Sequence, residues 1–249
     1  MKTIGLLGGM SWESTVPYYQ AVNQRVAARL GGLHSAKVVL YSVDFHEIET
    51  VQHAGQWDQA GERLAEAGRS LERAGADFIV ICTNTMHKVA PAIENAVAIP
   101  LLHIATPTAR AIQAAGLGRI GLLGTAFTME QTFYRGHLES EFGLEVIVPE
   151  ARERAAVHRI IYEELCRGVI RAESRDTYRE IMDGLARQGA EGIILGCTEI
   201  SLLVGPDDAS VPLFDTTALH ATAAADYALG DAGEAPDAAA ATASDVVGA

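Results

Sequence analysis

The sequence IGLLG at residues 4–8 recurs without change at residues 120–124, 116 positions further along the chain. Two further pairs of similar segments follow in the same order, at separations of 114 and 112 residues: 71–79 with 185–193, and 99–101 with 211–213. Any two α/β units share apolar strands and glycine turns, which could account for one such pair but poorly for three. The sequence therefore predicts two copies of one structural unit.

Short apolar runs alternate with longer segments of helical period along most of the chain. Strands are expected near residues 3–8, 37–43, 77–82, 99–103, 118–123, 143–148, 192–197 and 211–214. This alternation predicts parallel sheets covered by helices on both faces. The expected fold class is α/β, with two pseudo-symmetric doubly wound domains related by internal duplication. Their active site should lie in the interdomain cleft, because such sheets bind ligands beyond the carboxyl ends of their strands.

The domain bounds follow from the repeat. We expect the first α/β domain to comprise residues 1–98 and about 208–229, and the second to comprise residues 99–207. Residues 230–249 are mostly Ala, Asp and Gly and have no periodic apolar face. They are predicted to form a disordered tail.

Composition excludes several classes of partner. The chain has 249 residues and a formal net charge of −13, which argues against binding to nucleic acid or to an anionic membrane. The apolar run at residues 4–9 is too short for a signal sequence or a membrane span. Three cysteines without the paired spacing of a zinc site predict free thiols in a reducing cytoplasm and no bound metal.

The repeat also pairs individual residues. A separation of 114 residues aligns Thr83 with Cys197, and it aligns Cys82 with Gly196. Neighbouring residues at a strand end normally point to opposite faces, so Thr83 and Cys82 cannot both face the cleft. We therefore expect Cys82 to pack as a small buried side chain and Thr83 to be the cleft residue that corresponds to Cys197.

Three motifs resemble the signatures of the aspartate/glutamate racemase family. They are GGM at residues 8–10, TNTMH at 83–87 and GCTE at 196–199, and the family order is Gly-Gly-Met, Cys-Asn-Thr-x-His and Gly-Cys-Thr-Glu. The resemblance runs from residue 3 to about residue 229. It implies an amino-acid racemase without pyridoxal phosphate, metal or any other cofactor, acting on a small-molecule amino-acid substrate as a homodimer.

The resemblance also implies roles for particular residues. Cys197 and Thr83 would be the catalytic pair, one removing the α-proton and the other returning a proton to the opposite face. The residues expected to bind substrate are Met10, Gln52, Asn84, Thr85, Thr125, Thr198 and Glu199. For several of them a structural role is an alternative: helix capping for Asn84, Thr85 and Thr198, dipole compensation for Glu199. His87 could likewise be a structural imidazole.

The chain departs from the family pattern at Thr83, where a cysteine is usual. A hydroxyl is a much weaker acid than a thiol, so Thr83 would be a poor base, although it could donate or relay a proton. Three outcomes remain open at this point: slow racemisation by Cys197 and Thr83, a preference for one enantiomer, or participation of Cys82.

The substrate class is also open. A second carboxylate is normally bound by arginine or lysine, and some family members carry such a cation in the loop after the second strand. Residues 44–52 contain no Arg or Lys here, although Gln52 could hydrogen-bond a side chain and Arg167 could replace the missing cation. The expected substrate is therefore aspartate or glutamate, as the family implies, and the alternative that this loop favours is a broader range that includes neutral amino acids. A non-catalytic amino-acid-binding protein, and a decarboxylase or isomerase with one catalytic cysteine, are further alternatives.

Overall fold

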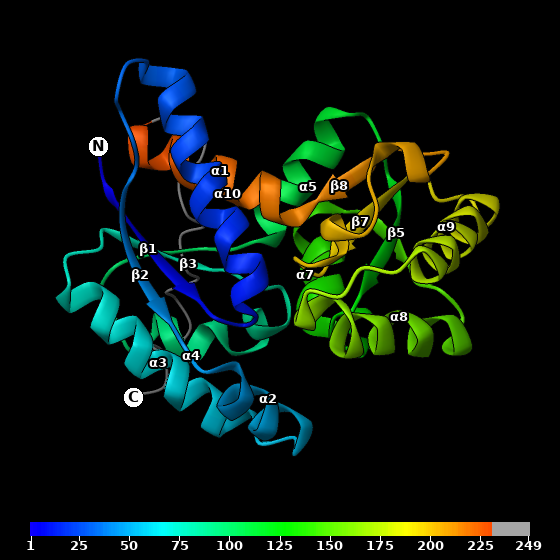
Figure 1. The fold of residues 1–249 in the computed structure, drawn as a ribbon, viewed down its shortest axis with the longest axis horizontal. Coiled ribbons are helices and arrows are strands. Elements are labelled where there is room, and N and C mark those ends of the chain that lie inside the picture. The colour runs from blue at the N-terminus through cyan, green and yellow to red at the C-terminus, as the bar shows by residue number, and fades with distance from the viewer. Residues whose placement is uncertain (231–249) are drawn as a thin grey trace, which may run out of the picture.

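The computed structural model describes residues 1–230 and contains two α/β halves, each built on a four-stranded parallel sheet (Figure 1). The strand orders are β2-β1-β3-β4 and β6-β5-β7-β8, so the two sheets have the same topology. The strands are β1 (Thr3–Gly8), β2 (Lys37–Ser42), β3 (Phe78–Ile81), β4 (Leu101–Leu102), β5 (Arg119–Gly124), β6 (Glu145–Ile147), β7 (Gly192–Gly196) and β8 (Leu213–Asp215). The predicted fold class is confirmed, and each of the eight expected strands is present.

Helices cover both faces of each sheet. They are α1 (Trp12–Leu30), α2 (Phe45–His53), α3 (Trp57–Arg73), α4 (Ala90–Glu94), α5 (Ala105–Ala114), α6 (Ala126–Glu130), α7 (Thr132–Phe142), α8 (Ala151–Glu163), α9 (Ala172–Arg187) and α10 (Thr216–Leu229). Within residues 1–230 there are also four short 3₁₀ helices: η1 (Thr85–Val89), η2 (Leu165–Arg167), η3 (Ile200–Leu202) and η4 (Pro206–Asp208). Within residues 1–230, no helix is both long and apolar enough to cross a membrane.

Within each half, the first two of the repeated segments pack against each other. Gly5 of β1 lies where a side chain would collide with Ala76 and with the carbonyl oxygen of Phe78, next to Leu71 near the end of α3. Gly121, the equivalent residue of β5, lies in the same way against Leu185 of α9. A glycine in the strand thus lets the segment that leads into the neighbouring strand approach closely, and the pattern is retained in both halves.

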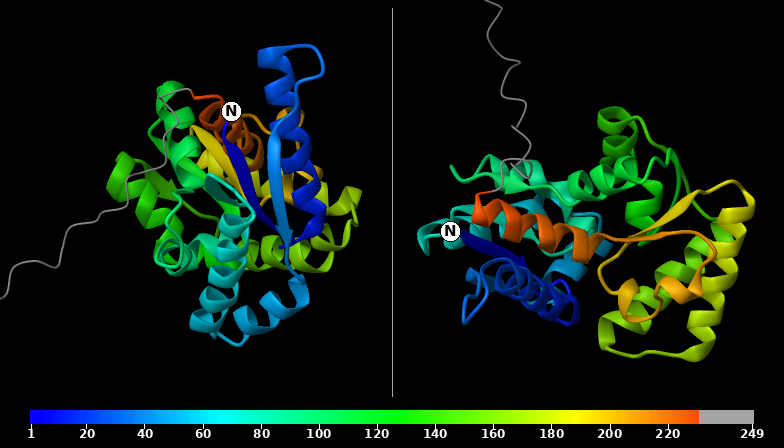
Figure 2. Two further views of the ribbon diagram at one scale, coloured as in Figure 1. Left: turned by 90° about the vertical axis from the view of Figure 1, so that its left-hand side faces the viewer. Right: turned by 90° about the horizontal axis from the view of Figure 1, so that it is seen from above.

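Two helices are exchanged between the halves. The chain leaves β4 of the first sheet and enters α5, whose Ile112 packs in the core of the second half. It leaves β8 of the second sheet and enters α10, whose Ala221 and Ala224 pack beside Tyr18 in the core of the first half. Figure 2 shows α10 reaching back from the second half to the side of β1.

The exchange alters the predicted division of the chain. Residues 101–102 were expected in the second domain and residues 213–215 in the first, but strand pairing places each in the other sheet. Each fourth strand pairs with the third strand of its own copy, as the bond from Ile79 N–H to the Pro100 carbonyl shows. Only the helix that follows it changes sides. The predicted disordered tail lies, from residue 231 onward, outside the described residues.

A group of buried histidines lies near the junction of the halves. The two ring nitrogens of His220 contact the Tyr18 hydroxyl at 2.9 Å and the Leu102 carbonyl oxygen at 2.8 Å. His87 is stacked edge to face with His103, with ring centroids 4.5 Å apart. Burial is the main cause that lowers the pKa of both His87 and His220 to about 3. Both imidazoles are therefore neutral in the folded protein near neutral pH.

This burial predicts acid sensitivity. In the unfolded chain both histidines titrate near pH 6.5, whereas the folded protein resists their protonation. Their contribution to stability is complete above pH 6.5 and is lost as pH falls toward 3, at up to about 1.4 kcal/mol per pH unit for each histidine. Urea unfolding between pH 7.5 and 4.5 should show this loss. His220→Asn should flatten the profile and the exposed His34→Asn should leave it unchanged; equal slopes in all three proteins would contradict the assignment.

Candidate active site

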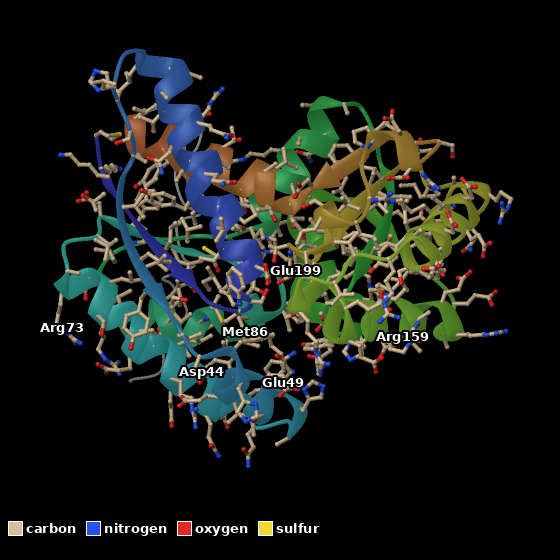
Figure 3. The ribbon with its side chains drawn as sticks, viewed as in Figure 1. Asp44, Glu49, Arg73, Met86, Arg159 and Glu199 are labelled. Atoms are coloured by element: carbon tan, nitrogen blue, oxygen red, sulfur yellow. The ribbon has the colours of Figure 1, made fainter. Side chains whose placement is uncertain are left out.

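The carboxyl ends of the central strands of both sheets open onto one pocket between the halves. Seven of the nine predicted site residues line it: Met10, Gln52, Thr83, Thr85, Thr125, Cys197 and Glu199. The pocket is narrow: the room left among these side chains is about 10 Å³, on the order of one water molecule. Figure 3 shows Glu199 near the centre of the molecule, where the two halves meet.

Thr83 and Cys197 reach the pocket from opposite halves. Thr83 lies two residues beyond the end of β3, and Cys197 follows β7 directly. Their residues are 8% and 7% exposed, so both are screened from bulk water but in contact with the pocket. Cys82 does not line the pocket: it is fully buried with Tyr18 in the first core, its sulfur 3.7 Å from the Val80 carbonyl oxygen. The alternation predicted for residues 82 and 83 is therefore present.

Glu199 is the centre of a buried hydrogen-bond network. Its Oε2 accepts from the Cys197 thiol and from the Thr198 hydroxyl, both at 3.0 Å. Its Oε1 accepts from Ser11, from the hydroxyl at 2.7 Å and from the backbone N–H at 3.2 Å. Burial, and then the charge of Glu199, raise the pKa of Cys197 well above its ordinary value. The free protein therefore holds Cys197 as a thiol that donates to a carboxylate.

Two predicted site residues do not line the pocket. Asn84 donates from Nδ2 to the Thr216 hydroxyl at 3.0 Å, and its buried Oδ1 has no partner. The Thr198 hydroxyl donates to Glu199. His87 also lies behind the pocket, where Nδ1 is 2.8 Å from the Thr83 carbonyl oxygen and Nε2 accepts from the Ile104 N–H. The imidazole thus fixes the backbone that carries Thr83, which is the structural alternative.

An aromatic cluster joins the two halves at the mouth. Phe45 of α2 stacks on Tyr162 of α8, with ring centroids 6.4 Å apart, and Gln52 donates to the Tyr162 hydroxyl at 2.7 Å. His53 meets Tyr162 edge to face at 5.3 Å. Figure 3 shows Glu49 on α2 below the junction and Arg159 on α8 beside it. Helix α2 thus packs against α8 of the other half beside the pocket.

Sequence reasoning missed five lining residues: Phe45, Met86, Ile161, Tyr162 and Cys166. Phe45 lies in the loop at residues 44–52 and Met86 in the motif at residues 83–87. Their positions in these segments could have indicated that they line the pocket. Ile161, Tyr162 and Cys166 come from α8 and η2, which carry no motif and no echo in the first half. Their helical period marked them only as residues facing a core.

The pocket contains no positive side chain. None of its lining residues in the described chain is Lys or Arg, and Glu199 is its one acidic residue. Arg167, the suggested replacement cation, is exposed. Nor do the described His, Cys, Asp and Glu side chains form any group of three or more that could hold a metal ion.

Comparisons with known proteins agree on one family. Residues 7–224 match the family model described as Asp/Glu/hydantoin racemase. A solved structure described as a candidate Asp/Glu racemase of Yersinia pestis is 62% identical, with a TM-score of 0.85 over 92% of this chain and all of that one. An aspartate racemase homologue of Pyrococcus horikoshii is 35% identical, with a TM-score of 0.79 and the same coverage.

A relative with a described activity is more distant. The broad-specificity amino-acid racemase RacX of Bacillus subtilis is 25% identical over 222 residues, covering 86% of this chain and 93% of its own.

The Cys197–Glu199 contact gives a prediction about thiol chemistry. Glu199→Gln removes the negative charge that raises the pKa of Cys197, while an amide oxygen remains to accept from the thiol. Alkylation of Cys197 by iodoacetamide, followed by peptide mass spectrometry, should therefore reach half its maximal rate at a lower pH, by about one unit. The exposed Glu163→Gln serves as the control. An unshifted profile in Glu199→Gln would show that the carboxylate does not govern this thiol.

Proposed function

The chain belongs to the Asp/Glu/hydantoin racemase family, and from that membership we propose that it is a cofactor-independent racemase of amino acids with uncharged side chains. The observation that carries the proposal is the position of Thr83 and Cys197, which enter one pocket from opposite halves. Inversion at an α-carbon needs a proton acceptor on one face and a proton donor on the other. A single group would return the proton to the face it left.

The chemistry begins at Cys197. Its S–H bond points to Glu199 Oε2 at 3.0 Å, so the carboxylate can take the thiol proton and leave a thiolate. The thiolate then removes the substrate α-proton, and the resulting carbanion shares its charge with the α-carboxylate. Thr85 and Thr125, whose hydroxyl oxygens are 2.9 Å apart, offer hydrogen bonds to that carboxylate from the two halves.

Thr83 is the weaker acid–base group, on the face of the substrate opposite to Cys197. Its hydroxyl can deliver or relay a proton to the carbanion, but it ionises far less readily than a thiol. Because the two enantiomers have equal free energy, kcat/KM must be the same in both directions. The unequal pair at residues 83 and 197 therefore shows its asymmetry in kcat and KM separately.

The uncharged lining supports the substrate class. A second carboxylate in this pocket would face the buried Glu199 without any arginine or lysine among the lining residues. An unpaired charge in such a site costs several kcal/mol. Phe45, Met86 and Ile161 instead offer apolar contacts. The similarity to a broad-specificity racemase agrees with this reading, and aspartate or glutamate is the alternative that the assay must weigh.

Proton NMR in D₂O tests the reaction directly. The protein should exchange the α-hydrogen of L- and D-methionine with inversion, and Cys197→Ser should slow this exchange by a factor on the order of 10²–10⁴. Thr83→Ala should retain exchange of one enantiomer but lose inversion, because the Cys197 face remains intact. Thr83→Cys should accelerate inversion. A folded protein that binds amino acids but exchanges none would instead be an amino-acid-binding protein.

Two variants of Gln52 test the substrate class. Gln52→Arg places a cation in the pocket and should raise kcat/KM for aspartate relative to methionine by about tenfold, equivalent to about 1.4 kcal/mol. Gln52→Met removes the same amide without adding charge, and it should not. Racemisation rates measured on both amino acids decide between the classes. Wild-type protein that already prefers aspartate would overturn the assignment of an uncharged substrate.

A further inference from the structure

Glu199 is a buried anion without a cation. Its residue is 2% exposed, and no Lys or Arg in residues 1–230 forms an ion pair with it. A carboxylate in that position is stable only if hydrogen-bond donors replace the lost water. Two of its four donors come from Ser11, which lies 188 residues away in the other half.

Ser11 departs from the ordinary behaviour of its position. It is the N-cap residue of α1, where a serine hydroxyl normally accepts from the N–H groups of its own helix. Here it makes no such bond. Its hydroxyl donates to Glu199 Oε1 at 2.7 Å instead, and its backbone N–H points to the same oxygen. A residue that gives up a local capping bond for a contact across the molecule is a candidate for function.

We propose that Ser11 is a positioning residue for proton abstraction: it holds Glu199 as a carboxylate with Oε2 directed at Cys197, so that Glu199 can receive the thiol proton. This rests on the racemase function proposed above. In the step itself the S–H bond of Cys197 breaks and an O–H bond forms at Oε2. The proton passes between two heavy atoms that lie 3.0 Å apart, and no electrons are exchanged with a redox partner.

The turn that carries Ser11 is itself fixed. The Ser11 carbonyl oxygen accepts from the Thr15 hydroxyl at 2.8 Å and from the Ser14 hydroxyl at 3.2 Å. The Gly9 N–H in turn donates to Thr15 at 2.9 Å. Gly9 has φ +90°, and a side chain there would collide with the backbone of Val43. These contacts define where the Ser11 hydroxyl can point, and Ser14 supplies a matched residue that shares the turn without contacting Glu199.

Four other ionisable groups beside this pair have raised pKa values. Cys166 of η2, Tyr162 of α8, Tyr178 of α9 and Tyr18 of α1 lie close enough for charge coupling with Glu199, and burial raises the pKa of each. Glu13 of α1 lies near Cys166. None of these four groups is therefore expected to set an acid limb in a pH profile of the reaction.

The test is the pH profile of α-hydrogen exchange. Ser11→Ala removes the short hydrogen bond to Oε1, so Glu199 binds a proton more readily and the acid limb of kcat/KM should move up by about one pH unit. Ser11→Thr retains a hydroxyl and should restore the limb. Ser14→Ala should leave it in place. A limb that stays fixed in Ser11→Ala, or moves equally in Ser14→Ala, would overturn the proposal in favour of a purely structural turn.

A second readout does not depend on turnover. Glu199 and Cys197 share protons, so weakening the carboxylate's hydrogen bond shifts the shared proton toward Glu199 and leaves more thiolate. Alkylation of Cys197 by iodoacetamide at pH 7 should be several-fold faster in Ser11→Ala than in Ser14→Ala. Equal rates would overturn the positioning role even in an active enzyme. Conversely, a wild-type protein that exchanges no amino acid but shows this difference would overturn the racemase and keep the Ser11–Glu199–Cys197 coupling.

Discussion

The exchange of α5 and α10 between the halves is the contact on which the rest of the structure depends. Each helix follows the last strand of one sheet and packs in the core of the other half. The two sheets are thereby held with the carboxyl ends of their central strands at a common pocket. Thr83 and Cys197 follow equivalent strands, so the same constraint that joins the halves also places these two residues at one site.

The pocket concentrates negative charge where water is scarce. Glu199 is stabilised there by hydroxyl, thiol and amide donors, and its charge raises the pKa of the neighbouring Cys197 thiol. An arginine beside Glu199 would stabilise the carboxylate more strongly but would weaken it as a proton acceptor. Neutral donors stabilise the anion while leaving it able to take a proton. The absence of a lining cation also bears on substrate choice, because it leaves the pocket without a partner for a second carboxylate.

Much of the fold could be predicted because the repeated segments make equivalent packing contacts in the two halves. Gly5 with Leu71 and Gly121 with Leu185 are contacts between echoed segments, so finding the echoes located strands and helices together. The two-residue period of a strand separated Thr83 from Cys82. The sheets that residues 101–102 and 213–215 join could not be predicted, because the sequence of a short apolar strand does not indicate which strand it pairs with. Tyr162 and Cys166 were missed since a helix face turned toward a pocket has the same apolar period as one turned toward a core.

The returning helix has a consequence for how the protein is made. Tyr18 and Val22 of α1 find their packing partners in Ala221, Ala224 and Ala225, which are among the last of the described residues to leave the ribosome. The amino-terminal half therefore exposes one apolar face until α10 has been synthesised. Domains of many proteins fold one after another as they emerge, but here the first core is completed last. Each half therefore completes its core with a helix that follows the last strand of the other sheet.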